Sequence, residues 1–138
     1  MATFDPHKFR ELVFLNLFSF DIGQGPSDEL FDLIASECKV AKRHVFDASA
    51  RAEAIFKRRN ECDELIKSVC DEYRIERIMC AERNILRLAI FELMLEQQLP
   101  ESVVFAEAKR LARKFSTKEA AGLIHALLGA LKERNHGA

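Results

Sequence analysis

The chain has 138 residues, of which 49% are hydrophobic and 31% charged, a balance that excludes a disordered chain and fits one globular domain. Its formal net charge of −1 excludes a strong overall attraction to nucleic acid or membranes, although basic residues can still gather on one face. Five glycines and three prolines are few for a β-rich protein with many turns, so the composition predicts an all-α fold.

The first two predicted helices begin at capping sequences. Asp5 before Pro6 is typical of a helix start, because Asp caps free N–H groups and proline tolerates the first helical position. Apolar residues then recur at helical spacing as far as Phe20. The glycine- and proline-rich residues 23–26 end this helix, and Ser27 is the predicted N-cap of the second.

The segment 39–73 carries weaker signals. Lys39 to His44 is basic without a helical period, and we expect a linker or a helix end there. Apolar residues repeat at helical spacing from Val45 to about Arg59, and again from Cys62 to Tyr73. The charged residues 57–60 either break the chain between two helices or form the charged face of one continuous helix.

The most apolar segment predicts a central helix from about Ala81 to Gln97, with neighbours on more than one side. Pro100 ends it, because the residue before a proline avoids the α region, and the next helix starts near Glu101. Ser116 and Glu119 fit a capping box at the start of the last helix. The chain therefore has six or seven predicted helices.

The residue pattern gives no sign of a metal, a cofactor, a membrane span or catalysis. Four cysteines form no Cys-x-x-Cys pair, which favours reduced thiols over a zinc site: Cys38, Cys62, Cys70 and Cys80. No stretch approaches the roughly 18 apolar residues that span a bilayer, so we expect a cytoplasmic protein. Glu92 and Glu96 lie four residues apart, a spacing typical of solvated helix faces, and no nucleophile or metal motif accompanies them.

Basic residues form three candidate binding groups, at the start of the first helix, in the expected linker, and at the break between the last two helices. The groups are His7, Lys8 and Arg10; Lys39, Lys42, Arg43 and His44; and Arg110, Arg113, Lys114 and Lys118. Each group alone is typical of a solvated face. If they converge in space, RNA phosphates are the natural ligand, with Phe4 or Phe9 available to stack on bases.

Several short sequences resemble the bacterial NusB antitermination family. The densest part is the run from Leu86 to Leu93, followed by Pro100, Val103, Glu107-Ala108, Leu111-Ala112 and Lys114-Phe115. Near the N-terminus, Arg10-Glu11 and the run from Leu17 to Phe20 resemble the family's first helix. The resemblance therefore covers essentially the whole chain, most thinly between residues 25 and 75.

This resemblance implies one domain over residues 1–138, built from two perpendicular three-helix bundles at about 5–75 and about 78–134. It implies a transcription antitermination factor that is not an enzyme and needs no cofactor. Such a factor binds boxA RNA of ribosomal RNA leader transcripts together with ribosomal protein S10 (NusE), and joins RNA polymerase and other Nus factors indirectly. The alternative is a NusB-like protein-interaction scaffold or homodimer with weakened or no specific RNA binding.

The resemblance also implies site residues. The expected RNA-binding residues are Lys8, Arg10, His7, Arg113, Lys114, Lys118 and Glu119. The expected NusE-facing residues are Glu82, Phe18 and Glu92. The family has an arginine-rich start to its first helix, of which only Lys8 and Arg10 remain firmly cationic here. Fewer cations mean fewer phosphate contacts and a weaker salt dependence.

Overall fold

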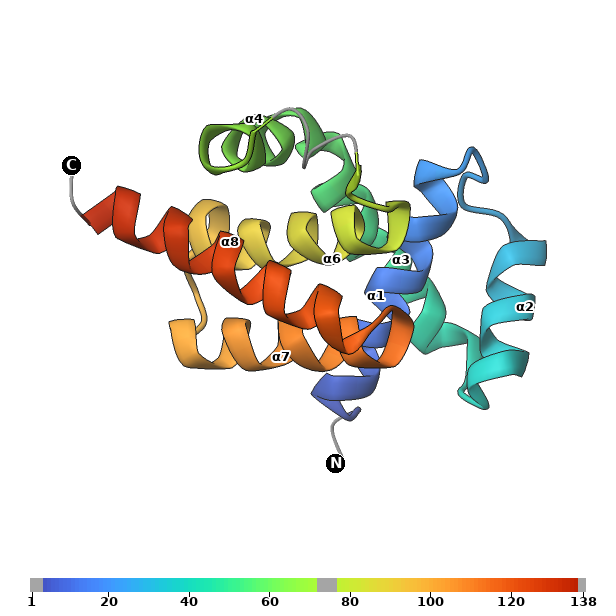
Figure 1. The fold of residues 1–138 in the computed structure, drawn as a ribbon. Helices are drawn as coiled ribbons and strands as arrows, with labels where there is room; N and C mark the ends of the chain where they lie inside the picture. The colour runs from blue at the N-terminus through green and yellow to red at the C-terminus, as the bar shows by residue number, and fades with distance from the viewer. Residues whose placement is uncertain (1–3, 72–76, 137–138) are drawn as a thin grey trace. The chain divides into compact units, whose positions relative to one another are not determined.

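The computed structural model describes residues 4–71 and 77–136, and these residues contain seven α-helices, one π-helical segment and no strand (Figure 1). This confirms the predicted all-α fold. The chain divides into two compact units, Met1–Lys57 and Arg58–Ala138. Each unit has its own packed helices and is described by itself.

Unit 1 contains α1 (Pro6–Asp21), α2 (Asp28–Cys38) and α3 (Lys42–Lys57). Both predicted N-caps are confirmed. The Asp5 carboxylate accepts the backbone N–H of His7 at 2.9 Å, and the Ser27 hydroxyl accepts that of Leu30 at 3.1 Å. Helix α3 packs against both α1 and α2. The side chains that fill this unit include Leu12, Leu17, Phe20, Phe31, Ile34, Val45 and Ile55.

The expected linker after α2 is shorter than its sequence suggested. Lys39 adopts a left-handed conformation at φ 56° and ends α2, and α3 begins three residues later. Lys42, Arg43 and His44 therefore lie in the first turn of a helix and not in a flexible connection. The sequence did not predict this helix start, because residues 42–44 are basic and the apolar residues at helical spacing begin only at Val45.

Unit 2 contains α4 (Arg59–Val69), α6 (Cys80–Ile90), the π-helical segment η1 (Phe91–Glu96), α7 (Glu101–Phe115) and α8 (Lys118–His136). Helix α6 contacts α4, α7 and α8, and lies among them in Figure 1. All its residues from Asn84 to Ile90 are buried. The prediction of a central helix with neighbours on several sides is therefore confirmed.

The charged residues 57–60 do separate two helices, since α3 ends at Lys57 and α4 starts at Arg59. The two units divide at this point, whereas the predicted sub-bundles divided near residues 75–78. Helix α4 packs against α6 and α8, with Cys62 and Ile66 buried, which groups it with the later helices. The predicted apolar stripe to Tyr73 runs past the end of α4, and residues 72–76 lie outside the described residues.

The end of the central helix contains a feature that the apolar pattern did not reveal. From Phe91 the chain winds as a π-helix, and the backbone N–H of Gln97 donates to the carbonyl of Glu92 at 3.1 Å. Gln97 itself is left-handed at φ 57°. The wider turn changes which side chains face inward, because the residue spacing per turn differs from that of an α-helix.

Candidate functional site

The first basic group lies at the start of α1. His7 is exposed, and Lys8 and Arg10 are half-buried. The Asp5 carboxylate accepts the backbone N–H of His7 and the Asp5 carbonyl accepts that of Phe9, so this end of α1 is already capped. Positive charge for a phosphate therefore comes from the side chains, Lys8 above all.

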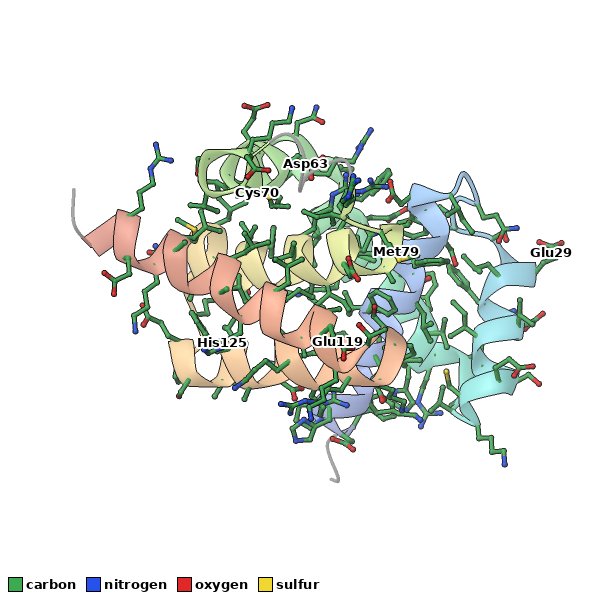
Figure 2. All side chains as sticks on the ribbon, viewed as in Figure 1. Glu29, Asp63, Cys70, Met79, Glu119 and His125 are labelled. Atoms are coloured by element: carbon green, nitrogen blue, oxygen red, sulfur yellow. The ribbon has the colours of Figure 1, made fainter. Side chains whose placement is uncertain are left out.

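The third basic group surrounds the connection between α7 and α8, except for Arg110, which pairs with Glu107 at 2.7 Å within α7. We call residues 113–119 the α7–α8 junction. Arg113 and Lys114 are exposed in the last turn of α7. Lys118 and Glu119 are exposed in the first turn of α8, where Figure 2 labels Glu119. Four of the seven predicted RNA-binding residues thus come together here within unit 2, and the other three lie together in unit 1.

The predicted capping box at this junction is wrong by one residue. The Thr117 hydroxyl accepts the backbone N–H of Ala120 at 3.0 Å, so Thr117 and not Ser116 caps α8. The backbone N–H of Ser116 instead donates to the carbonyl of Ala112 at 2.8 Å and ends α7. Glu119 lies in the first turn of α8 without the predicted partner, so its carboxylate stays on the surface.

Glu82, an expected NusE-facing residue, has both carboxylate oxygens bonded within unit 2. Its Oε2 accepts the backbone N–H of Met79 at 3.2 Å and so caps α6. Its Oε1 accepts the hydroxyl of Ser116 at 3.2 Å, although the two residues are 34 positions apart. Glu82 therefore connects the start of α6 to the α7–α8 junction.

The other two expected NusE-facing residues differ in exposure. Phe18 is half-buried on α1, with its ring tilted against Phe14 at 6.1 Å. Glu92 is only 5% exposed on η1, so its interpretation as part of a solvated pair with Glu96 is wrong. This burial leaves Glu92 little carboxylate surface to offer a partner.

Two of the four residues in the basic group at residues 39–44, Lys42 and His44, are engaged inside unit 1, whereas Lys39 and Arg43 are exposed. Lys42 forms ion pairs with Asp28 at 3.2 Å and Asp32 at 3.0 Å, and these hydrogen-bonded carboxylates raise the pKa of Lys42. The His44 ring stacks on Phe4, with centroids 3.9 Å apart and planes 11° from parallel. Phe4 therefore already has a stacking partner from the protein.

Sequence reasoning missed a buried polar network between α4 and α6. The guanidinium of Arg87 donates to both oxygens of Asp63, at 2.9 and 2.7 Å, and to Asn84 Oδ1 at 3.2 Å. The Cys62 thiol contacts the carbonyl of Arg87 at 3.7 Å, and burial raises the pKa of Cys62 to about 11. Figure 2 labels Asp63 on α4. The partners are 24 residues apart, so no local pattern reveals them.

Two further findings concern metals and membranes. Within residues 4–71 and 77–136, no three or more His, Cys, Asp or Glu side chains are grouped so that they could hold a metal ion. Over the same ranges, every helix is too short or too polar to cross a bilayer.

Comparison with known proteins identifies the family. A sequence model of the NusB family matches residues 7–133. The chain belongs to the NusB family. Transcription antitermination protein NusB of Chlamydia muridarum is 34% identical over 131 residues, covering 93% of this chain and 80% of the relative. NusB of Symbiobacterium thermophilum is 31% identical, covering 95% and 91%.

Solved structures agree on the fold. A crystal structure of Thermotoga maritima NusB superimposes with a TM-score of 0.72 at 26% identity, covering 95% of this chain and 92% of that one. A crystal structure of antitermination factors NusB and NusE in complex with double-stranded RNA gives a TM-score of 0.75 at 24% identity, covering 93% and 96%. NusB family membership also supports the prediction that the chain is not an enzyme, since these relatives are transcription antitermination proteins.

Proposed function

We propose that this chain is a cytoplasmic transcription antitermination factor that binds boxA-type RNA together with NusE. The observation that carries the proposal is the family match over residues 7–133, which includes nearly all the described helices. In this role the protein contributes binding surface and no chemistry. RNA polymerase and the other Nus factors join through the complex that it forms with RNA and NusE.

The charge distribution supports RNA as a ligand even though the whole chain has a net charge of −1. In the α7–α8 junction, Arg113 and Lys118 are exposed, and neither has an ion-pair partner among the described residues. The start of α1 adds the half-buried Lys8. Such cations bind phosphate and release counterions from RNA, which makes the affinity fall as salt rises.

A fluorescence anisotropy titration tests this function. A labelled boxA-type RNA and a scrambled RNA of equal composition are each titrated with the protein, with and without NusE, across a salt series. We expect weak binding to boxA RNA alone, tighter binding with NusE, and a clear preference over the scrambled RNA. Lys8→Ala and Arg113→Ala should each reduce the slope of log affinity against log salt by about 0.7 per lost phosphate contact. No binding at low salt with NusE present contradicts the proposal.

The alternative of a protein-interaction scaffold or homodimer is favoured by one observation on unit 1. Ile22, Leu33 and Phe46 are 56%, 57% and 61% exposed, and binding of a second protein over any of them would remove apolar surface from water. Light scattering and pull-down with NusE test this alternative. Binding to NusE, or a dimer lost in Phe46→Ser, without any RNA dependence would favour the scaffold. A monomer that ignores NusE would count against it.

A further inference from the structure

We infer that Glu82 and Ser116 form an internal positioning pair that holds the α7–α8 junction in its RNA-binding shape. This inference rests on the proposed function, because the junction matters only if it meets RNA. It also changes the expected role of Glu82, from a residue on the NusE-facing surface to one that acts through Ser116.

The junction needs such a restraint because it is short and irregular. Only Ser116 and Thr117 separate α7 from α8. Ser116 has φ −141° and ψ −123°, so it is not helical and α7 and α8 do not form one continuous helix here. A side-chain hydrogen bond from Ser116 to a fixed acceptor can hold this conformation.

Glu82 is a suitable fixed acceptor. Its own position is set by the bond from the Met79 backbone N–H at 3.2 Å, which uses Oε2 and leaves Oε1 for the Ser116 hydroxyl. It lies in the first turn of α6, whose following residues are almost fully buried. A hydrogen bond from a hydroxyl to a carboxylate is stronger than one between two neutral groups, because the acceptor is charged.

The consequence for RNA concerns the two turns on either side of Ser116. Arg113 lies three residues before it and Lys118 two residues after it, both exposed. Arg113 lies in the last turn of α7 and Lys118 in the first turn of α8, so a change of backbone conformation at Ser116 would move these two helix ends, and their cations, relative to each other. Loss of the pair should therefore weaken RNA binding without removing any cation.

A double-mutant cycle measured on RNA affinity tests the pair, using the full chain with NusE and boxA-type RNA. We expect Ser116→Ala and Glu82→Ala each to weaken RNA binding about three- to tenfold, as the loss of one charge-assisted hydrogen bond allows. Glu82→Ala also loses the bond from the Met79 N–H and should be the weaker of the two single variants. The double variant should be little weaker than Glu82→Ala, because that variant has already lost the contact with Ser116. Ser116→Thr keeps the hydroxyl and should restore binding.

Further variants separate the effect of the Glu82 charge on RNA binding from a general loss of folding. Glu82→Gln keeps an oxygen acceptor and removes the charge, so it should weaken RNA binding less than Glu82→Ala. Glu133→Gln removes an exposed carboxylate from α8, and Ser68→Ala removes an exposed hydroxyl from α4, so neither should change RNA affinity. Circular dichroism checks that each variant is folded. Glu82→Ala should leave NusE affinity unchanged if its role is internal.

The outcomes separate the two proposals. Wild-type protein that fails to bind RNA overturns the proposed function and the positioning role with it. Wild-type binding with additive effects of Glu82→Ala and Ser116→Ala overturns the positioning pair alone. Loss of NusE affinity in Glu82→Ala, with Ser116→Ala unaffected, would return Glu82 to the NusE-facing surface and also overturn the pair.

Discussion

The two units differ in the side-chain contacts between their helices, although unit 1 also has the exposed Lys42 ion pairs and unit 2 also has an edge-to-face contact of Phe105 with His125. In unit 1, Phe20 meets Phe56 and Phe31 meets Phe46 edge to face, with ring centroids 5.9 and 6.0 Å apart. In unit 2, polar bonds connect helices that are far apart in the sequence. These bonds are Arg87 to Asp63, Ser116 to Glu82, Lys132 to Glu101 at 2.8 Å, and Arg134 to the Ser68 carbonyl at 2.8 Å.

Because the contacts differ, we expect the two units to respond differently to substitution of single side chains. Aromatic contacts depend weakly on direction, so another apolar side chain of similar volume retains much of their energy. A buried ion pair needs both partners, because removing one leaves a charge in a medium of low polarity. We expect unit 1 to change gradually and unit 2 to change sharply when single side chains are replaced.

The largest effect is expected for Asp63→Ala in unit 2. The Arg87 side chain is 5% exposed and would keep Asn84 as a partner, but it would lose both bonds to a carboxylate. We expect the free energy of unfolding to fall by about 3 kcal/mol, near the lower end for a broken buried pair, because Asp63 is partly exposed. Urea unfolding followed by circular dichroism measures it.

Two further variants test whether the loss comes from the broken buried ion pair. Glu61→Ala breaks the ion pair with Arg58, whose side chains are 42% and 54% exposed, and should change stability little. Adding Arg87→Met to Asp63→Ala removes the stranded charge and should recover part of the loss. If Asp63→Ala lowers the free energy of unfolding no more than Glu61→Ala does, buried polar bonds do not make unit 2 sensitive, and the expected difference between the units is wrong.

The next effect is expected for Phe20→Leu in unit 1. Phe20 is 8% exposed, and leucine keeps most of the buried apolar area while losing the edge contact with Phe56. We expect a loss of about 1 to 2 kcal/mol in the same unfolding measurement. Phe46→Leu, at an exposed position, should cost less. A loss above that of Asp63→Ala would show that aromatic geometry is as demanding as the ion pair.

A smaller effect should be equal in both units. Thr117→Ala removes the N-cap of α8, and Ser27→Ala removes that of α2. Each should lower the free energy of unfolding by about 1 kcal/mol, since a cap satisfies a backbone N–H of its own helix only. Thr117→Ser keeps a hydroxyl and should retain most of the stability. Unequal losses would mean that the cap also carries contacts between helices.

These caps also show how far the sequence predicts the fold. Asp5 and Ser27 were predicted correctly because a cap depends on residues two or three positions away. At the α7–α8 junction two adjacent hydroxyls compete, and the choice of Thr117 depends on where α7 ends. Local patterns therefore predict which segments are helical and leave the boundaries uncertain by about a residue or two.

The candidate site was less predictable, for a physical reason. Sequence identifies basic segments, such as the one with Arg113 and Lys118, because charge is visible in composition. It does not reveal that Lys42 is paired across two helices, or that Glu82 bonds to a hydroxyl 34 residues away. Glu92 was misread because its charge was taken as the sign of a solvated face, although it lies three and four residues after the buried Ala89 and Leu88. The misses at Lys42 and Glu82 depend on tertiary contacts, whereas the burial of Glu92 follows the helical period against its charge.

The smallest effect is expected for Lys42→Met, which removes the ion pairs between α2 and α3 in unit 1. Lys42 and its partners Asp28 and Asp32 are well exposed, so water and salt already screen the attraction. The raised pKa of Lys42 means that its contribution is present below lysine's ordinary value of 10.5 and is lost as pH rises through the raised value. We expect no resolvable change in the urea midpoint at neutral pH in moderate salt, and a slight loss only at low salt. A loss comparable to that of Asp63→Ala would mean that unit 1 also depends on directional polar bonds, and that exposure does not account for the difference between the units.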